Sequence, residues 1–249
     1  MFRQMPDARS RCGTIRIKSA ASQKAPKPEP GPRPVKAKAK RGRPSKQEQA
    51  RRGDPRELLL DAVHEVMVAK NSIDVSVAEI AERAGQSPAV VQYHFGGKAG
   101  LLQALMRRGA DRSVAQLSDL IRMDLSPERK IAAHIRGLVK AYYQAPYVYA
   151  LFRYLSDSAP EGEEEAVFRE FAQPIVEFYD SVLAQGYAEG VFKKVSSMHM
   201  YMMVVGASDH IFARRRLLPA LFGVDEITDE ERRNYSDFLT EMVLNGLRR

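Results

Sequence analysis

The chain has 249 residues, of which 44% are apolar, enough to bury a sizeable core in one or two domains. Its longest apolar run, residues 200–207, is far shorter than the ~20 residues needed to cross a bilayer, which excludes a membrane-spanning protein. The single cysteine, Cys12, excludes an intrachain disulfide and favours a cytoplasmic location.

Charge is distributed unevenly along the chain. Residues 1–53 contain 16 Lys and Arg against 3 acidic residues, a net charge of +13, whereas residues 54–249 contain 23 against 28, a net charge of −5. Residues 25–34 are rich in Pro and poor in apolar side chains, so we expect residues 1–53 to form a disordered tail. The first twenty residues also have a composition found in transit peptides, which is an alternative for that segment.

The basic tail ends in Arg41-Gly42-Arg43-Pro44, which is similar to the core of an AT-hook. Gly42 would let the backbone lie close to the floor of the minor groove, with Arg41 and Arg43 extending along a narrow A·T tract of enhanced negative potential. The alternative is a solvated polycation that binds phosphates without base preference. Both interpretations predict nucleic acid as the partner.

The first helix of the folded part is predicted over residues 55–70. Asp54 has the side chain of an N-cap, and Pro55 suits the first helical turn. The helix has one apolar face, formed by Leu59, Ala62, Val63, Val66 and Met67. His64 lies off this face, and we therefore expect it to be a solvated surface residue.

Two short helices follow, and their ends are strongly specified. Ser76 and Glu79 have the spacing of a capping box, in which each side chain binds a backbone N–H of the first turn. Gly85 stands where the end of a helix favours positive φ, and Ser87 with Pro88 then begins the second helix. So short a turn predicts a helix-turn-helix, whose second helix fits the major groove of DNA. An ordinary helical hairpin in a bundle is the alternative.

Residues 56–105 resemble the DNA-binding domain of the TetR family of bacterial regulators. The resemblance is carried by residues 78–85 (AEIAERAG), Ser87, His94-Phe95, Lys98 and Leu101-Leu102. It implies an all-α fold in which a three-helix helix-turn-helix domain, residues 54–103, precedes a helical ligand-binding and dimerisation domain, residues 104–249. Residues 1–53 remain as the basic tail.

The resemblance also implies which residues contact DNA. In the second helix, residues 88–94, we expect Val91 and Phe95 to face the core, and Gln92 to contact base edges because its amide can pair bidentately with adenine. Ala89 and Val90 are placed to meet a thymine methyl group. The full set of expected DNA contacts is Arg41, Arg43, Ser76, Pro88, Ala89, Val90, Gln92, Tyr93, His94 and Lys98.

This chain departs from the family pattern in its recognition helix. Gln92 stands where Tyr is usual, and the helix contains no Arg or Lys. Residues 54–103 contain 4 basic and 7 acidic residues. The base preference therefore cannot be copied from a relative, and the tail must supply much of the electrostatic affinity for DNA.

Further helices are predicted along the rest of the chain. They cover residues 98–121, with Gly109 as a weak point where a break would fall, then 127–142, 146–155, 164–186, 198–215 and 228–246. We expect the helix over 164–186 to be kinked near Pro174, with Phe168, Phe171 and Phe178 facing inward.

The last two predicted helices are apolar on broad faces. The resemblance implies that they pair with their copies across a two-fold axis, whereas the alternative is that they complete the core of a monomer. We favour a homodimer, because one recognition helix contacts too few bases for useful specificity and a dimer contacts two half-sites.

Aromatic and Met residues are frequent in the middle helices. Core packing explains each of them separately, but together they favour an apolar cavity, since the family binds small molecules among these helices and such sites are lined in this way. The expected ligand contacts are Tyr142, Tyr147, Phe152, Phe171, Phe178, Met203 and His210, with His134 and His199 as further polar candidates. Neither metal-ligand spacing nor a nucleophile–base arrangement is apparent, so we expect no metal, no cofactor and no enzymatic activity.

The sequence therefore predicts a DNA-binding transcriptional regulator that forms a homodimer on a palindromic operator. We expect a repressor that is released from double-stranded DNA by a small, largely apolar effector. One alternative is an architectural protein that binds A·T-rich DNA through its tail, but it leaves the large helical domain unexplained. A helical enzyme or carrier is the other, and the absence of catalytic spacing argues against it.

Overall fold

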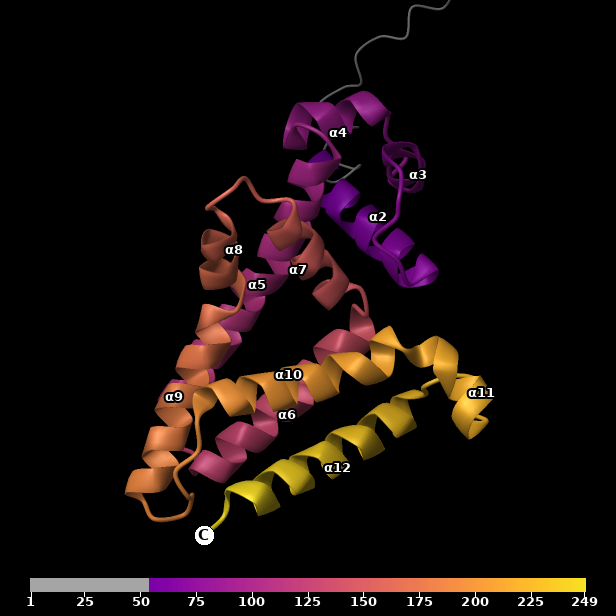
Figure 1. Ribbon diagram of the computed structural model, residues 1–249. Coiled ribbons are helices and arrows are strands. Elements are labelled where there is room, and N and C mark those ends of the chain that lie inside the picture. Colours follow the sequence, from indigo (N-terminus) through magenta and orange to yellow (C-terminus); the bar gives the residue numbers. More distant parts are fainter. Residues whose placement is uncertain (1–53) are drawn as a thin grey trace, which may run out of the picture. The chain divides into compact units, whose positions relative to one another are not determined.

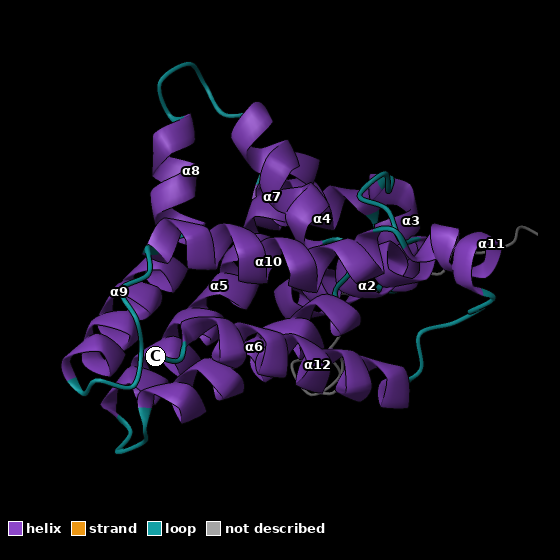
Figure 2. Cartoon of the chain, turned by 60° about the horizontal axis from the view of Figure 1, so that its bottom comes forward, coloured by secondary structure: helices purple, strands orange, loops and turns teal. Residues whose placement is uncertain are grey.

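The computed structural model describes residues 54–249, so the predictions for the tail, including Arg41 and Arg43, lie outside the described residues. Between Asp54 and Arg249 the chain contains helices and no strand, apart from an isolated antiparallel bridge between Phe192 and Arg248. The predicted all-α fold is confirmed for this part of the chain. Figure 1 and Figure 2 show how its helices are arranged.

The N-terminal helices are α2 (Pro55–Lys70), α3 (Val77–Arg83) and α4 (Pro88–Phe95). Asp54 caps α2 as predicted, its Oδ1 accepting a hydrogen bond from the Arg56 N–H at 2.9 Å. The capping box of α3 is also present, since the Glu79 N–H donates to Ser76 Oγ and the Ser76 N–H donates to Glu79 Oε2. Gly85 has a φ of +63°, the left-handed conformation that its position predicts.

The remaining helices are α5 (Lys98–Arg122), α6 (Pro127–Gln144), α7 (Val148–Asp157), α8 (Glu164–Phe171), α9 (Gln173–Ala188), α10 (Ser197–Ala213), α11 (Leu218–Phe222) and α12 (Asp229–Leu247), with a 3₁₀ turn at Arg215–Leu217. The long helix predicted over residues 98–121 is confirmed as α5, which runs through the weak point at Gly109 without a break. A single helical glycine costs only about 1 kcal/mol. Burial of Leu105 and Leu117 on either side offsets that cost.

The single kinked helix predicted over residues 164–186 is wrong. The chain instead forms α8 and α9, which meet at Ala172, and Pro174 lies in the first turn of α9. Proline has no N–H to donate, so it interrupts a helix but is tolerated where a new one begins. Phe168 is 45% exposed on α8, and does not face inward as predicted.

The described residues have two hydrophobic cores that share α5. The first lies among α2, α3, α4 and the start of α5, and Tyr147 and Leu151 from around the start of α7 belong to it. The second lies among α5, α6, α9, α10 and α12. Helix α5 contributes Leu101, Leu102 and Leu105 to the first core and Leu117 to the second. One continuous helix therefore connects the two cores.

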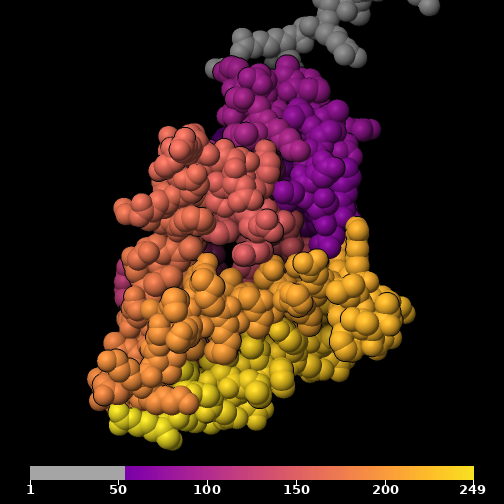
Figure 3. All heavy atoms as spheres, viewed as in Figure 1, coloured from indigo at the N-terminus to yellow at the C-terminus, as the bar shows by residue number. Residues whose placement is uncertain are grey.

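Helices α6, α10 and α12 pack against one another at the end of the folded region away from α3 and α4 (Figure 1). Large apolar side chains remain exposed on two of these helices: Met198, Met202 and Met203 on α10, and Phe238 and Met242 on α12. Figure 3 shows the surface hollowed between the α7 segment and α10.

Candidate functional site

Helices α3 and α4 are held in a fixed relative orientation by the turn between them. At the end of α3 the Gly85 N–H donates to the Glu82 carbonyl at 3.0 Å, and the Gln86 N–H donates to the Ala81 carbonyl at 2.8 Å. These bonds satisfy carbonyl groups that the last helical turn leaves unpaired. Val91 of α4 is fully buried, and it packs that helix against the first core.

The outer side of α4 carries most of the predicted DNA-contacting residues. Tyr93 is 84% exposed, and Pro88, Ala89 and Gln92 are exposed beside it. Val90 and His94 are half-buried, as is Lys98 at the start of α5, while the cap residue Ser76 is exposed. Phe95 is half-buried, and the Arg56 guanidinium lies over its ring at 5.5 Å.

Most positive charges near α4 are already paired. Of the four basic residues between positions 54 and 103, Arg56, Lys70 and Arg83 form ion pairs with Glu57, Glu79 and Glu65, respectively. Lys98 is the fourth, and no ion pair joins it to another residue of the described range. It is therefore the cation beside α4 that is best placed to meet an anionic partner.

The junction of α4 with α5 depends on Gly100, which the sequence analysis did not single out. A Cβ atom at this position would lie 1.9 Å from the Phe95 carbonyl oxygen, a backbone atom that a side-chain rotation cannot move. Glycine is thus required for the start of α5 to approach the end of α4 this closely. The distance to Phe95 is a tertiary detail, so the surrounding sequence gave no signal for it.

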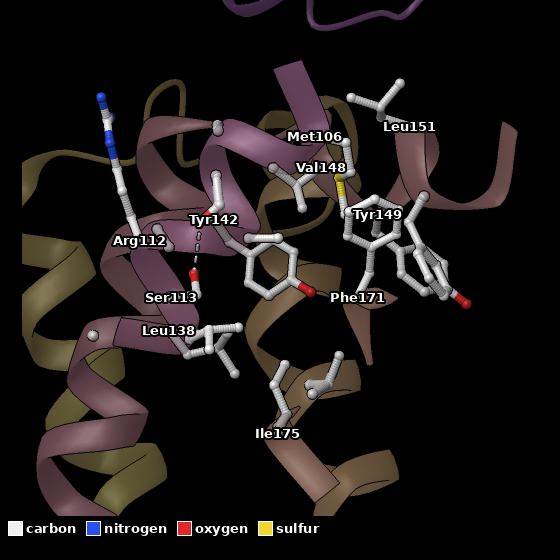
Figure 4. Close-up of a pocket in the computed structure, with 18 of the residues that line it drawn as sticks. Met106, Arg112, Ser113, Leu138, Tyr142, Val148, Tyr149, Leu151, Phe171 and Ile175 are labelled. Carbon is white, nitrogen blue, oxygen red and sulfur yellow. Dashed lines mark hydrogen bonds between the residues drawn. The ribbon is translucent and has the colours of Figure 1, made fainter. Parts of the chain in front are cut away.

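A cavity of about 890 Å³ lies among α5, α6, α7, α9 and α10. Its volume is at the upper end of the range for small-molecule sites. Much of its wall is apolar, and the side chains in Figure 4 converge on it from several helices. The apolar lining includes Leu105, Met106, Val114, Leu117, Leu138, Tyr142, Val148, Leu151, Phe152, Phe171, Ile175 and Val205.

The structure brings together four of the seven residues expected to contact a ligand, since Tyr142, Tyr147, Phe152 and Phe171 all line the cavity. The other three lie elsewhere. Phe178 is fully buried in the second core against His134, at a ring separation of 4.6 Å. Met203 and His210 are exposed on α10, whose cavity-lining residues include Tyr201 and Val205. Met203 is two residues from each of these, about 200° around the helix.

His64 is the main functional candidate that the sequence analysis missed. The expectation that it is a solvated surface residue is wrong, because it is half-buried, lines the cavity, and has its Nδ1 2.7 Å from the Tyr147 hydroxyl, with which it shares a hydrogen bond. Burial, with a smaller contribution from the Arg108 charge, lowers the pKa of His64. The contact joins residues 83 positions apart, which no local sequence pattern reveals.

A second contact holds α2 in place, because Arg108 joins it to α5. Its guanidinium donates hydrogen bonds to the Leu60 carbonyl at 3.1 Å and to Asp61 Oδ1 at 2.8 Å, and it lies 3.3 Å from Glu57 Oε2. The side chain is only 19% exposed, so these contacts are better shielded than ordinary surface ion pairs. Helix α2, which packs behind α3 and α4, is thus held against the wall of the cavity at two points.

Two predicted polar candidates in the helical domain lie outside the cavity wall. His134 is buried, its Nε2 2.9 Å from the Tyr179 hydroxyl, and burial lowers its pKa to about 4. His199 is exposed. Within residues 54–249, no group of three or more His, Cys, Asp and Glu side chains is arranged to hold a metal ion. No helix in this part of the chain combines the length and apolar composition needed to traverse a bilayer.

Two family models match successive parts of the chain. Residues 59–105 match the model of the tetR family of bacterial regulatory proteins, and residues 124–249, half of the chain, match the model of the tetracyclin repressor-like C-terminal domain. The HTH-type transcriptional regulator BetI of Brucella canis is 39% identical over 80 residues. That match spans 32% of this chain and about 40% of the length of BetI.

Solved structures share the fold at low sequence identity. FadR from Bacillus subtilis, determined in complex with stearoyl-CoA, is 18% identical with a TM-score of 0.59, and the match covers 76% of this chain and 98% of FadR. The ketosteroid transcriptional regulator KstR2 of Mycobacterium tuberculosis is 17% identical with a TM-score of 0.61, covering 79% and 96% of the two chains. Together with the matches to both domain models, these findings show that the chain belongs to the tetR family of bacterial regulatory proteins.

Proposed function

We propose that this protein is a ligand-responsive transcriptional repressor that binds a palindromic operator through α4 and is released when a small molecule enters the cavity. The observation that carries the proposal is the position of His64. This residue lines the cavity, yet it belongs to α2, the helix that packs against α3 and α4. A molecule in the cavity can therefore act directly on the DNA-binding unit.

The proposed DNA contacts divide into two kinds. Gln92 on the exposed side of α4, with Ala89 and Val90, is proposed to meet base edges in the major groove. Tyr93, which is exposed on the same helix, is proposed to contact a phosphate. Ser76 and Lys98 are proposed to bind phosphates, Ser76 through the helix N-terminus that it caps. Pro88 and His94 are proposed to add contacts at the two ends of α4. The net charge of +13 on residues 1–53, which include Arg41 and Arg43, is proposed to supply sequence-independent affinity.

A homodimer is part of the proposal. The exposed apolar side chains of α10 and α12 suit a helical interface between two copies, which would remove them from water. In such a dimer the two α4 helices would have to lie about 34 to 36 Å apart to enter successive major grooves on one side of DNA. A change in their separation or tilt would then lower operator affinity.

The proposed coupling passes through the contacts on α2 and α5. A ligand that alters the His64–Tyr147 hydrogen bond, or that moves α5 where Arg108 holds Asp61, would shift α2 and with it α4. The size of the response is limited by the difference in ligand affinity between the two states, typically 1 to 3 kcal/mol or about 5- to 150-fold in DNA affinity. Reciprocity requires DNA to weaken ligand binding by the same factor.

Footprinting on genomic fragments co-purified with the full-length protein tests the DNA-binding part of the proposal. A repressor of this kind protects a discrete palindrome, and removal of residues 1–53 leaves the base preference intact while reducing the salt dependence of binding, by about 0.9 in the log–log slope for each lost phosphate contact. Diffuse protection of A·T-rich DNA that disappears with the tail would contradict the proposal and indicate an architectural protein.

A further inference from the structure

The charged residues on the cavity wall are all of one sign. Arg108, Arg112 and Lys140 line the cavity together with His64, whereas none of its described lining residues is Asp or Glu. Acidic residues nevertheless outnumber basic ones, 28 to 23, in residues 54–249. The cavity therefore has a positive bias that the composition of the helical domain does not explain.

Two of these cations are available to a ligand. Arg108 is engaged by Glu57, Asp61 and the Leu60 carbonyl. By contrast, neither Arg112 nor Lys140 forms an ion pair with any residue in the described range. A positive charge that borders a partly apolar cavity without a protein partner favours an anion in that cavity.

Each of the two cations belongs to a polar stripe on a helix that lines the cavity. Arg112 and Gln116 are four residues apart on α5, and Lys140 and Gln144 are four residues apart on α6, so each pair shares a helix face, and all four side chains line the cavity. In Figure 4 the Arg112 side chain stands on the opposite side of the drawn group from the rings of Tyr149 and Phe171. Among the labelled side chains, the wall is thus polar at Arg112 and Ser113 and aromatic at Tyr149 and Phe171.

Arg112 is too far along α5 for its positive charge to be explained as a DNA contact. It follows Lys98 by 14 positions along α5, a rise of about 21 Å at 1.5 Å per residue. It therefore lies far along α5 from the junction with α4.

We propose that the effector is an amphiphile whose anionic head group, a carboxylate or a phosphate, lies beside Arg112 and Lys140 and whose apolar body lies among Phe152, Phe171 and Ile175. The inference rests on the proposed function of the cavity and adds the charge of its ligand. A cationic amphiphile meets like charges at Arg112 and Lys140, and an uncharged one leaves two cations without a partner, so both bind less tightly.

Isothermal titration calorimetry with the full-length protein tests this inference with four compounds of equal chain length. Dodecanoate and dodecyl phosphate carry anionic heads, dodecanol is uncharged and dodecylamine is cationic. We expect both anions, or the one whose head group fits, to bind about fivefold or more tightly than dodecanol, and dodecylamine to bind most weakly. Equal or tighter binding of dodecanol or dodecylamine, or no binding by any of the four, would overturn the inference.

A double variant, Arg112→Gln with Lys140→Gln, links the preference to the two side chains. We expect it to bind the anion and dodecanol equally while its affinity for dodecanol is unchanged. The matched control is Arg122→Gln with Arg129→Gln, which removes one exposed charge from α5 and one from α6 at positions outside the cavity wall. The control should keep the anion preference, and an equal loss in both double variants would show a general charge effect and contradict the inference.

Operator binding, measured with the same compounds, separates this inference from the proposed function. If dodecanol releases the operator as well as dodecanoate does, the protein is a ligand-responsive repressor but the anionic head is wrong. If dodecanoate binds with the expected preference and leaves operator affinity unchanged, the anion site is correct and the repressor mechanism is contradicted.

Discussion

The two hydrophobic cores of this protein differ in how completely side chains fill them. The core beneath α4 is filled by side chains such as Leu59, Val63, Ile80 and Val91, all fully buried. Helices α2 and α3 of this region begin at satisfied caps, and α3 ends in a defined turn. The core among α5, α6, α9, α10 and α12 borders a cavity of about 890 Å³, which the buried side chains of the first core reach only at Leu105, Tyr147 and Leu151, on the side away from α4. The helices α10 and α12 of this core also carry buried polar atoms without a hydrogen-bond partner among the described residues: Ser208 Oγ, Asp209 Oδ1 and Ser236 Oγ.

This difference separates two physical tasks. A surface that contacts DNA bases has to keep its shape, because a displacement of its side chains loses directional hydrogen bonds. A domain that responds to a ligand needs space and alternative packing arrangements. The border between the two is formed by α5 and by the contacts of His64 and Arg108, so we expect substitutions on either side of it to have separable effects.

The largest expected effect is that of Gly100→Ala, compared with Gly109→Ala on the same helix. A methyl group at position 100 meets the Phe95 carbonyl oxygen, so α4 must move away from α5, at a cost of about 3 kcal/mol. At position 109 a Cβ atom has no neighbour within 4 Å, and alanine stabilises a helix by about 0.5 to 1 kcal/mol. Thermal unfolding and operator binding measure both variants. Normal operator affinity in Gly100→Ala would show that the close approach is dispensable.

The next effect concerns acid stability of the ligand-binding domain. Burial holds the pKa of His134 at about 4, whereas a histidine in the unfolded chain titrates near 6.5. Between these values the unfolded state binds a proton that the folded state does not, so the free energy of unfolding falls as the pH decreases from 6.5 towards 4, by about 3 kcal/mol. Denaturant unfolding at several pH values measures this slope.

His134→Gln should unfold more easily at pH 7.5, because it loses the contact with Tyr179, and should show a shallower loss of stability towards pH 4. His199→Gln is the matched control, since that side chain is exposed and should leave the slope unchanged. An unchanged slope in His134→Gln would contradict the assignment.

A smaller and more local effect is expected on the DNA-binding surface. Gln92→Ala should relax specificity at one base pair in each half-site, at a cost of ~1 to 3 kcal/mol, because it removes a bidentate base contact. Lys98→Ala should weaken binding to all sequences alike, because it removes a phosphate contact. Affinities for a set of single-base operator variants distinguish the two patterns. A uniform loss with Gln92→Ala would mean that this side chain positions α4 and does not contact a base.

Features that depend on neighbouring residues could be predicted from the sequence. The capping box of Ser76 and Glu79, the N-cap at Asp54 and the positive φ of Gly85 each follow from a pattern within four residues, and all are present. The extent of α5 was also predicted, over residues 98–121 against Lys98–Arg122, and Gly109 does not interrupt it because a glycine that weakens an isolated helix is tolerated when the helix is packed on both sides.

Features that depend on distant residues could not be predicted. Aromatic residues at helical spacing look alike whether they face a cavity or a core, so Phe171 and Phe178 were indistinguishable, although Phe171 lines the cavity and Phe178 is packed against His134. The same limit applies to His64 and Tyr147, which are separated by 83 positions and meet only in the folded chain.

The proposed mechanism requires that a ligand bound in the cavity acts on the DNA-binding helices through α2. The most direct test is the ratio of operator dissociation constants with and without saturating dodecanoate, measured for the wild type, for Tyr147→Phe and for Tyr201→Phe. Both tyrosines line the cavity, but Tyr147 is bonded to His64 of α2 and Tyr201 belongs to α10. We predict a ratio of about 5 to 150 for the wild type and Tyr201→Phe, and a ratio close to 1 for Tyr147→Phe. A ratio close to 1 in the wild type, or an undiminished ratio in Tyr147→Phe, would contradict this mechanism.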